Sequence, residues 1–267
     1  VPHAEHRARD EVTPHPPPRV VALGRLGHQR RRARQNVDRQ YVIPPLNGRE
    51  EYGFPSHSPD AVAMVADVED ADQVQQMFDE IAERWGGELN ILINTVGPAV
   101  QGSVEQLSDA QWHKAVDGGV MGMVHCVRSA LPLLRRAQWA RIVNFSAQST
   151  QRQSPNLAAY TAAKAMVTSI SKNLSQLLAP DEIMVNVVSP GSIASEALVG
   201  WADSVGVDGS DPYALMTAID KHFGHPANLP RAGLPDEIGP VVAFLASRRN
   251  SYMTGANINV DGGSDFT

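Results

Sequence analysis

Beyond residue 60 the apolar positions fall into two alternating patterns. Short continuous apolar runs are typical of buried strands, and they occur at residues 61–67, 89–94, 141–146 and 183–190. Longer segments carry apolar residues at every third or fourth position and predict helices, at residues 71–85, 111–136, 158–178 and 236–246. The order of the two patterns predicts strands that alternate with helices along most of the chain.

Further signals extend this pattern and support its boundaries. The stretch VVAL at residues 20–23 is a plausible first strand, and residues 256–263 predict a last short one. Gly86 follows the apolar stripe of the first helix and predicts its end. Ser108 is expected to cap the helix through residues 111–136, because its hydroxyl can accept an otherwise unpaired N–H.

Strands and helices in this order predict parallel crossover connections. The expected fold is therefore of the α/β class: a single-domain Rossmann-type doubly wound parallel sheet with helices on both faces, over residues 1–267. One core of this kind accommodates a chain of 267 residues without a second domain.

In such sheets ligands bind outside the carboxyl ends of the strands. The residues at those ends are Asp67-Val68, residues 94–97, residues 146–149 and residues 190–193. Because these ends lie along one edge of the sheet, we expect all four segments to border one crevice.

A tyrosine and a lysine stand one helical turn apart at the start of the predicted helix 158–178. Tyr160 and Lys164 are four residues apart, so both face the same side of the helix. A phenol titrates near pH 10, too high for efficient proton transfer at neutrality, and a nearby ammonium lowers its pKa. The pair can act as a general acid and base. On its own this spacing also fits two residues on a solvated helix surface.

The motifs occur in a recognisable order: Asp after one strand, N-x-x-G after the next, a serine cluster after the third, Y-x-x-x-K, then Pro-Gly after the fourth. This order, with the tail RAGLPDEIGPVVAFLASRRNSYMTGANINVDGG, resembles the classical short-chain dehydrogenase/reductase family. The resemblance covers Ala61 to Gly263, and the chain looks closest to the branch that contains 3-oxoacyl-carrier-protein reductases.

The resemblance implies an NAD(P)-dependent oxidoreductase that interconverts a secondary alcohol and a ketone, with Tyr160 as acid and base and Lys164 tuning it. It also implies cofactor contacts. Asp67 and Val68 would meet the adenine, Asn94 and Gly97 would border its ribose, Lys164 would bind the nicotinamide ribose, and Pro190, Gly191 and Ile193 would line the nicotinamide. No metal is implied, and the sequence does not distinguish NAD from NADP.

Two positions depart from the family pattern. The catalytic serine of the family lies 13 residues before the tyrosine, and Ala147 stands there. Ser146 or Ser149 would have to supply the hydroxyl, and we favour Ser146 because it ends the strand. The helix asparagine of the family falls at about Gly119, which has no side chain to hold a water. The alternative hypothesis is therefore a catalytically impaired subunit or binding scaffold with weak or no cofactor binding.

The opening segment, residues 1–58, differs from the rest in composition. Residues 1–60 carry ten arginines and no lysine, and nine of the 19 prolines. The family places T-G-x-x-x-G-x-G after its first strand, whereas GRLGHQRRRARQ follows here, so the phosphate-binding loop is not intact. Arginines that contact phosphates, a diverged fold and a shifted reading frame are three explanations. We favour the frame shift and expect no nucleic-acid partner.

In the family the region at residues 192–230 is the lid over the substrate. Its Trp201, Tyr213, Met216 and Phe223 would line an apolar pocket or pack within the domain, so we expect an apolar or bulky carbonyl or alcohol substrate. His222 and His225 are expected at the surface. Family resemblance also implies a homotetramer or homodimer.

The cysteine count and the length of the apolar runs bear on the cellular compartment and on membrane contact. The single cysteine, Cys126, excludes an internal disulfide, fits a reducing cytoplasm and is expected to be a buried helix residue. No run approaches the roughly 20 apolar residues that span a bilayer, and the first twelve residues lack the apolar stretch of a secretory signal. We therefore expect a cytoplasmic protein with no membrane contact.

Overall fold

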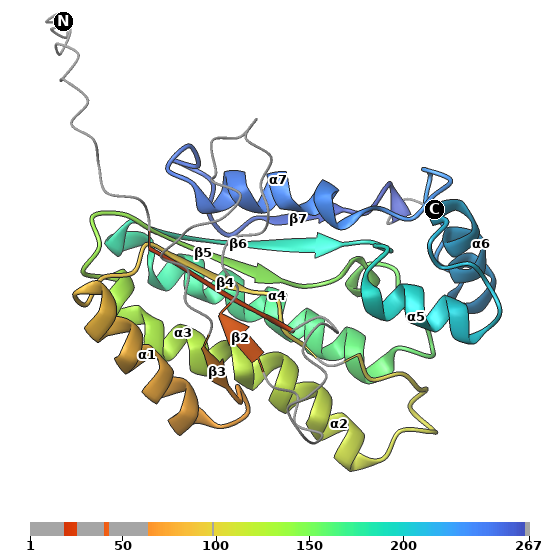
Figure 1. The fold of residues 1–267 in the computed structure, drawn as a ribbon, viewed down its shortest axis with the longest axis horizontal. Helices are drawn as coiled ribbons and strands as arrows, with labels where there is room; N and C mark the ends of the chain where they lie inside the picture. The colour runs from red at the N-terminus through yellow and green to blue at the C-terminus, as the bar shows by residue number, and fades with distance from the viewer. Residues whose placement is uncertain (1–18, 26–39, 43–63, 98, 265–267) are drawn as a thin grey trace, which may run out of the picture.

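The computed structural model describes residues 19–25, 40–42, 64–97 and 99–264. Their strands form one sheet in the order β3-β2-β1-β4-β5-β6-β7 (Figure 1). The strands are β1 (Val20–Arg25), β2 (Gln40–Val42), β3 (Val65–Ala66), β4 (Ile91–Asn94), β5 (Ala140–Phe145), β6 (Ile183–Pro190) and β7 (Asn257–Val260). The α/β class and the doubly wound sheet predicted from sequence are confirmed.

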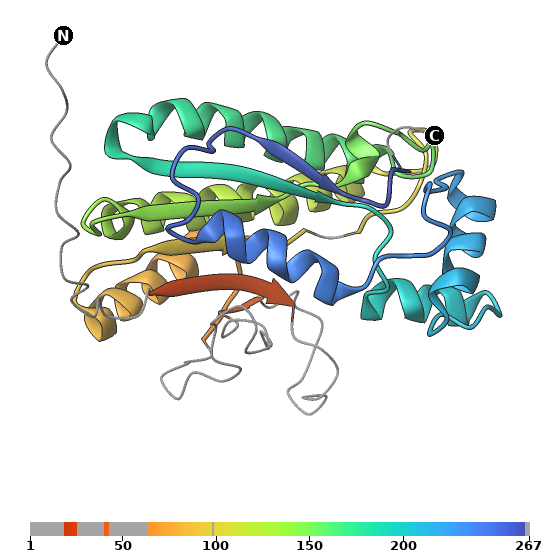
Figure 2. The ribbon, with the colours of Figure 1, turned by 90° about the horizontal axis from the view of Figure 1, so that it is seen from above.

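Helices lie on both faces of the sheet (Figure 2). The helices are α1 (Ala71–Trp85), α2 (Asp109–Val116), α3 (Gly122–Leu134), α4 (Ala158–Leu177), α5 (Glu196–Ser204), α6 (Pro212–Phe223) and α7 (Pro235–Ala246). Helices α1, α3 and α4 cover one face of the sheet and form the larger core with it. Helix α7 packs on the other face, against β1, β5 and β6. The fifth and sixth helices lie beyond the carboxyl ends of the strands (Figure 1).

One strand departs from the parallel arrangement. β1 pairs in parallel with β4, and the pairings from β4 to β7 are parallel as well, but β2 runs antiparallel to both β1 and β3. A parallel crossover normally needs a helix with an apolar stripe. The stretch HQRRRARQNVDR between β1 and β2 has no such stripe. The expectation of an all-parallel sheet is therefore wrong at β2.

The expected helix at residues 111–136 is interrupted. The π-helical turn η3 (Asp117–Met121) separates α2 from α3, and it contains Gly118 and Gly119. Wide turns of this kind are rare inside helices and frequent at functional sites. Ser108 is the N-cap of α2, as expected, in a capping box with Gln111, whose Oε1 accepts the backbone N–H of Ser108 at 3.0 Å.

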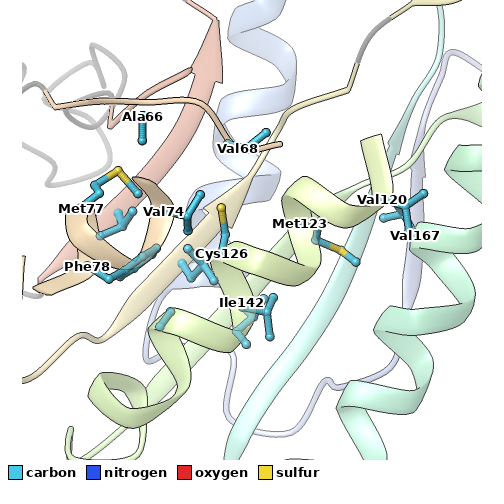
Figure 3. Packing of buried hydrophobic residues seen from close by; sticks show 14 of the residues in the cluster. Ala66, Val68, Val74, Met77, Phe78, Val120, Met123, Cys126, Ile142 and Val167 are labelled. Atoms are coloured by element: carbon cyan, nitrogen blue, oxygen red, sulfur yellow. The ribbon is translucent and has the colours of Figure 1, made fainter. Parts of the chain in front are cut away.

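The larger core packs α1 and α3 against the sheet (Figure 3). The stripe predicted for α1 is buried, as Val74, Met77, Phe78 and Ile81 show. Cys126 lies among these side chains, and burial raises the pKa of its thiol to about 12. A thiol with so high a pKa is chemically inert at neutral pH, in agreement with a structural role.

No helix among the described residues is long and apolar enough to cross a membrane.

Candidate functional site

The carboxyl ends of β4, β5 and β6 meet the start of α4 at one edge of the sheet. Asn94 pairs in register with Asn144, and Phe145 with Val188, so the three strands end side by side. α4 runs back from this edge and carries Tyr160 in its first turn. The strand ends and the tyrosine helix therefore share the crevice edge that the sequence predicts.

Lys164 is held firmly at this edge. Its side chain is 5% exposed, and Nζ donates to the carbonyl oxygen of Phe145 at 2.9 Å. Nζ also lies 6.0 Å from the ring centroid of Tyr160. A Cβ built on Gly97 would lie 3.1 Å from this Nζ, so the glycine after β4 leaves the room that the ammonium occupies.

Tyr160 is half-buried, and burial raises the pKa of its phenol to about 12. This direction is opposite to the lowering that we expected from Lys164. The physical reason is that the ammonium bonds to Phe145 and lies over the ring at 6.0 Å from its centre, so desolvation of the phenolate is the dominant effect. The phenol of Tyr160 therefore stays protonated at neutral pH in the cofactor-free protein.

Asn94 links the sheet to α4 through buried side chains. Its Nδ2 donates to Oδ1 of Asn144 at 2.8 Å, and Nδ2 of Asn144 donates to the hydroxyl of Ser171 at 2.9 Å. Asn94 is 5% exposed, and its Oδ1 has no partner among the described residues. An unpaired buried acceptor at a strand end is available to a ligand or an ordered water.

Asp67 and Val68 lie in the turn between β3 and α1. The carboxylate of Asp67 accepts the backbone N–H of Glu69 at 3.0 Å. The side chain of Val68 is only 2% exposed and packs against Gly122, and its carbonyl oxygen lies 2.8 Å from Nδ1 of His125. A ligand at this turn would therefore meet Asp67 more readily than the side chain of Val68.

Pro190 ends β6, and Gly191 and Ile193 follow it in the next loop. The N–H of Gly191 donates to the carbonyl of Val260 at 3.0 Å, and a Cβ on Gly191 would lie 2.6 Å from Cα of Asp261. Only glycine fits so close to the end of β7. The loop is thereby fixed at the carboxyl end of β6, where we expect it to line a ligand.

Comparison with known proteins identifies the family. A family model described as Enoyl-(Acyl carrier protein) reductase matches residues 54–265. The chain is 31% identical to the 3-oxoacyl-[acyl-carrier-protein] reductase FabG of Staphylococcus aureus over 204 residues, which are 76% of this chain and 77% of that relative. The chain belongs to the short-chain dehydrogenase/reductase family. The resemblance inferred from the motifs is confirmed.

Two solved structures of short-chain dehydrogenase/reductase fold support the assignment. The ligand-free aldohexose dehydrogenase of Thermoplasma acidophilum matches with a TM-score of 0.69 and 30% identity, over 79% of this chain and 82% of that one. The NADPH-bound short chain oxidoreductase of Pseudomonas aeruginosa PAO1, described as containing an atypical catalytic center, matches with a TM-score of 0.66 and 26% identity, over 74% of each chain. The chain is an enzyme of this family.

The serine position of the family is the clearest departure. Ala147 occupies it and is buried. The hydroxyl of Ser146 donates to the carbonyl of Lys164 at 2.9 Å and accepts from Thr168 at 2.8 Å. The hydroxyl of Ser149 accepts from Thr161 at 3.3 Å. Because the proton of Ser146 is already bonded to the backbone of α4, this geometry does not suit the catalytic role that we assigned to it.

The stretch GRLGHQRRRARQ, residues 24–35, stands where short-chain dehydrogenases have their glycine-rich segment, and from residue 26 on it lies outside the described residues. Most of the opening segment, including the run of arginines at residues 30–34, lies outside the described residues. The three explanations for this segment therefore stay predictions. The family match begins at residue 54, close to the change in composition near residue 58.

Sequence reasoning gave no role to two residues of this region, Gln148 and His225, although Gln148 lies within the predicted segment 146–149. Gln148 is buried at the start of the 3₁₀ turn η4 (Gln148–Thr150), directly after Ala147. His225, which we expected at the surface, is 4% exposed, because the left-handed Gly224 ends α6 and turns the chain inward. Neighbouring His222 is exposed, as expected. The glycine before His225 was the one available signal.

The lid segment folds as α5 and α6. A cavity of about 310 Å³ opens beside it and is lined by Gln101, Gly102, Gln106, Asn156, Trp201, His222 and Phe223. Trp201 and Phe223 contact each other with ring centroids 4.9 Å apart. Met216 packs into the core of the lid, and Tyr213 is 57% exposed. Two of the four side chains proposed for the pocket therefore line this opening, and its other walls are polar.

Proposed function

We propose that the protein is an NAD(P)-dependent oxidoreductase that interconverts a secondary alcohol and a ketone. The observation that carries the proposal is the position of Lys164 and Tyr160 at the carboxyl edge of the sheet. Nζ of the lysine is anchored 2.9 Å from the carbonyl of Phe145 and lies beside Gly97 and the tyrosine ring.

In this mechanism the cofactor, when bound, supplies or accepts the hydride. Tyr160 gives its proton to the carbonyl oxygen during reduction, and the high pKa of the phenol suits a donor that must stay protonated. In the oxidation direction the phenol must lose its proton. Lys164 would hold the cofactor near the phenol, and the positive charge of an oxidised cofactor there would favour the phenolate and lower the pKa of Tyr160.

The residues at the crevice fit such a cofactor. Asn94 offers a buried Oδ1 without a partner among the described residues, and Gly97 leaves space in front of Lys164. These two residues would border the adenine ribose, with Asp67 and the backbone of Val68 at the adenine. The loop of Pro190, Gly191 and Ile193 would line the nicotinamide, and Lys164 would bind its ribose.

A second candidate is a short-chain dehydrogenase/reductase subunit that binds partners but turns over poorly. Ala147 favours it, because alanine cannot donate a hydrogen bond to the reacting oxygen and the hydroxyl of Ser146 is bonded elsewhere. Gly119 also favours it, because this glycine stands where the family has an asparagine and has no side chain to hold a water.

For the substrate, we propose a small molecule with a bulky or apolar part that contacts Trp201 and Phe223. We further propose a cytoplasmic homotetramer or homodimer that uses α4. Met166 and Leu177 on this helix are 43% and 62% exposed, which supports an interface there.

Cofactor titration separates the two candidates. Purified protein titrated with NADH and with NADPH, followed by fluorescence, should saturate in the micromolar range with at least one of them. NAD(P)H oxidation with a panel of ketones should then be detectable and should fall by about a hundredfold or more in Tyr160→Phe. No binding of either cofactor at millimolar concentration would favour the scaffold, and unchanged turnover in Tyr160→Phe would remove the tyrosine from the mechanism.

A further inference from the structure

Two buried side chains, one in η4 and one just after α6, carry polar atoms without a partner among the described residues. These atoms are Oε1 of Gln148 and Nε2 of His225, and each residue is 4% exposed. The side chains face each other, with Nε2 of Gln148 3.5 Å from Nδ1 of His225. An exchange of the amide oxygen and nitrogen would still leave one of them unpaired. Because buried polar groups in native proteins are nearly always satisfied, this pair lacks a hydrogen-bonding group from outside.

Gln148 lies at the catalytic end of the crevice. It directly follows Ala147, the position of the family's serine, at the carboxyl end of β5. The next residue in the turn, Ser149, accepts a hydrogen bond from Thr161, which adjoins Tyr160 on α4. Gln148 therefore lies in the wall of the crevice, next to the position of the family's serine.

His225 approaches the same wall from the lid. It follows α6, whose last residues His222 and Phe223 line the cavity beside Asn156 and Gln101. Burial is the main cause that lowers the pKa of His225; interactions with the backbone of Gln153 and Arg152 oppose this in part, and the Arg152 cation adds to it. At neutral pH the imidazole is therefore uncharged, and the pair offers hydrogen-bond donors and acceptors without net charge.

We propose that Gln148 and His225 form an uncharged polar subsite that binds a second oxygen of the substrate, a hydroxyl or carbonyl group near the carbon that exchanges hydride. This inference rests on the proposed function and narrows its substrate class to hydroxyketones and the diols formed from them. A substrate oxygen at this place completes the hydrogen bonds that the protein leaves open, and a simple ketone leaves them unpaired. Sites built to pair a substrate hydroxyl discriminate strongly against the analogue that lacks it.

The test compares matched ketones. We expect kcat/KM with NAD(P)H to be at least about tenfold higher for 3-hydroxybutan-2-one or 4-hydroxybutan-2-one than for butan-2-one. Gln148→Met, which keeps the size of the side chain, and His225→Leu should each bring this ratio toward one, mainly through KM. The control Gln151→Met changes an exposed glutamine of the same loop that bonds Asn259, and it should keep the wild-type ratio. Equal preference in the wild type, or an unchanged ratio in both subsite variants, would overturn the proposal.

A binding measurement tests the subsite without relying on turnover. In the presence of cofactor, the hydroxyketone should raise the Tm of the wild type more than butan-2-one does, and Gln148→Met should lose that difference. If no ketone is reduced but this protection is present, the subsite stands and the oxidoreductase proposal fails. If the hydroxyketone protects neither protein, the unpaired atoms serve only the structure and the subsite is refuted.

Discussion

Nζ of Lys164 donates a hydrogen bond to the carbonyl oxygen of Phe145, 2.9 Å away, at the carboxyl end of β5. This bond ties the start of α4 to the strand that precedes the serine loop. A second bond, from the hydroxyl of Ser146 to the carbonyl of Lys164, joins the same two elements at 2.9 Å. The lysine is therefore held in place by bonds within the protein itself.

Tyr160 should stay protonated in the cofactor-free protein until the pH exceeds about 10. Burial raises the pKa of its phenol to about 12. Because the folded-state pKa is the higher one, the stability that Tyr160 contributes is fully present below about pH 10, and it is lost as the pH rises toward the folded-state pKa. Tyrosinate absorbance in the wild type, compared with Tyr160→Phe, measures the titration. A Tyr160 step below about pH 9 would contradict this prediction.

Oxidised cofactor should move this titration to lower pH. A positive nicotinamide beside Lys164 stabilises the phenolate, so saturating NAD⁺ or NADP⁺ should lower the apparent pKa of Tyr160 by at least about one unit. The same absorbance titration with cofactor checks the result, and Lys164→Met should reduce the shift. An identical curve with and without a cofactor that binds would show that Lys164 does not tune the tyrosine.

Ser146→Ala should lower the thermal stability of the protein but have little effect on kcat. The variant loses a hydrogen bond to the carbonyl of Lys164 and one from Thr168. A cost of about 1 kcal/mol is expected, or a Tm lower by roughly 2–4 °C for a protein of this size. Thermal unfolding and steady-state kinetics measure the two effects. A hundredfold fall in kcat at an unchanged Tm would instead restore Ser146 as the catalytic hydroxyl.

Ala147→Ser should increase turnover. The added hydroxyl would lie where the family has its serine and would donate to the reacting oxygen, an interaction worth about tenfold to hundredfold in kcat. Ala147 is only 7% exposed, so the extra oxygen must fit a tight space, and a small loss of Tm is expected with it. Unchanged or lower kcat in a folded variant would mean that this family member uses another donor.

The sequence predicted the strands and helices that border this site, but not the burial of His225 or the unpaired amide of Gln148. The bounds of β6 and α4, and the placing of Asn94, Tyr160 and Lys164 at strand and helix ends, follow from local periodicity, which one chain displays directly. The burial of His225 and the unpaired amide of Gln148 depend on packing between the lid and η4, and no local pattern carries that information. The π turn at Gly118-Gly119 is likewise an outcome of packing between elements, whereas the missing apolar stripe between β1 and β2 is visible in the sequence.

Gly97→Ala should weaken cofactor binding with little effect on the fold. A Cβ at this position would lie 3.1 Å from Nζ and 3.3 Å from Cε of Lys164, closer than ordinary contacts. The lysine must shift from its bond to Phe145, and we expect the Kd of the cofactor to rise about tenfold, which corresponds to roughly 1.4 kcal/mol. Gly200→Ala is the matched control, since a Cβ there meets nothing within 4 Å on α5. It should stabilise the protein by about 0.5–1 kcal/mol and leave the Kd unchanged. Fluorescence titration with thermal unfolding measures both, and equal cofactor affinity in the two variants would show that the space beside Lys164 is not part of the cofactor site.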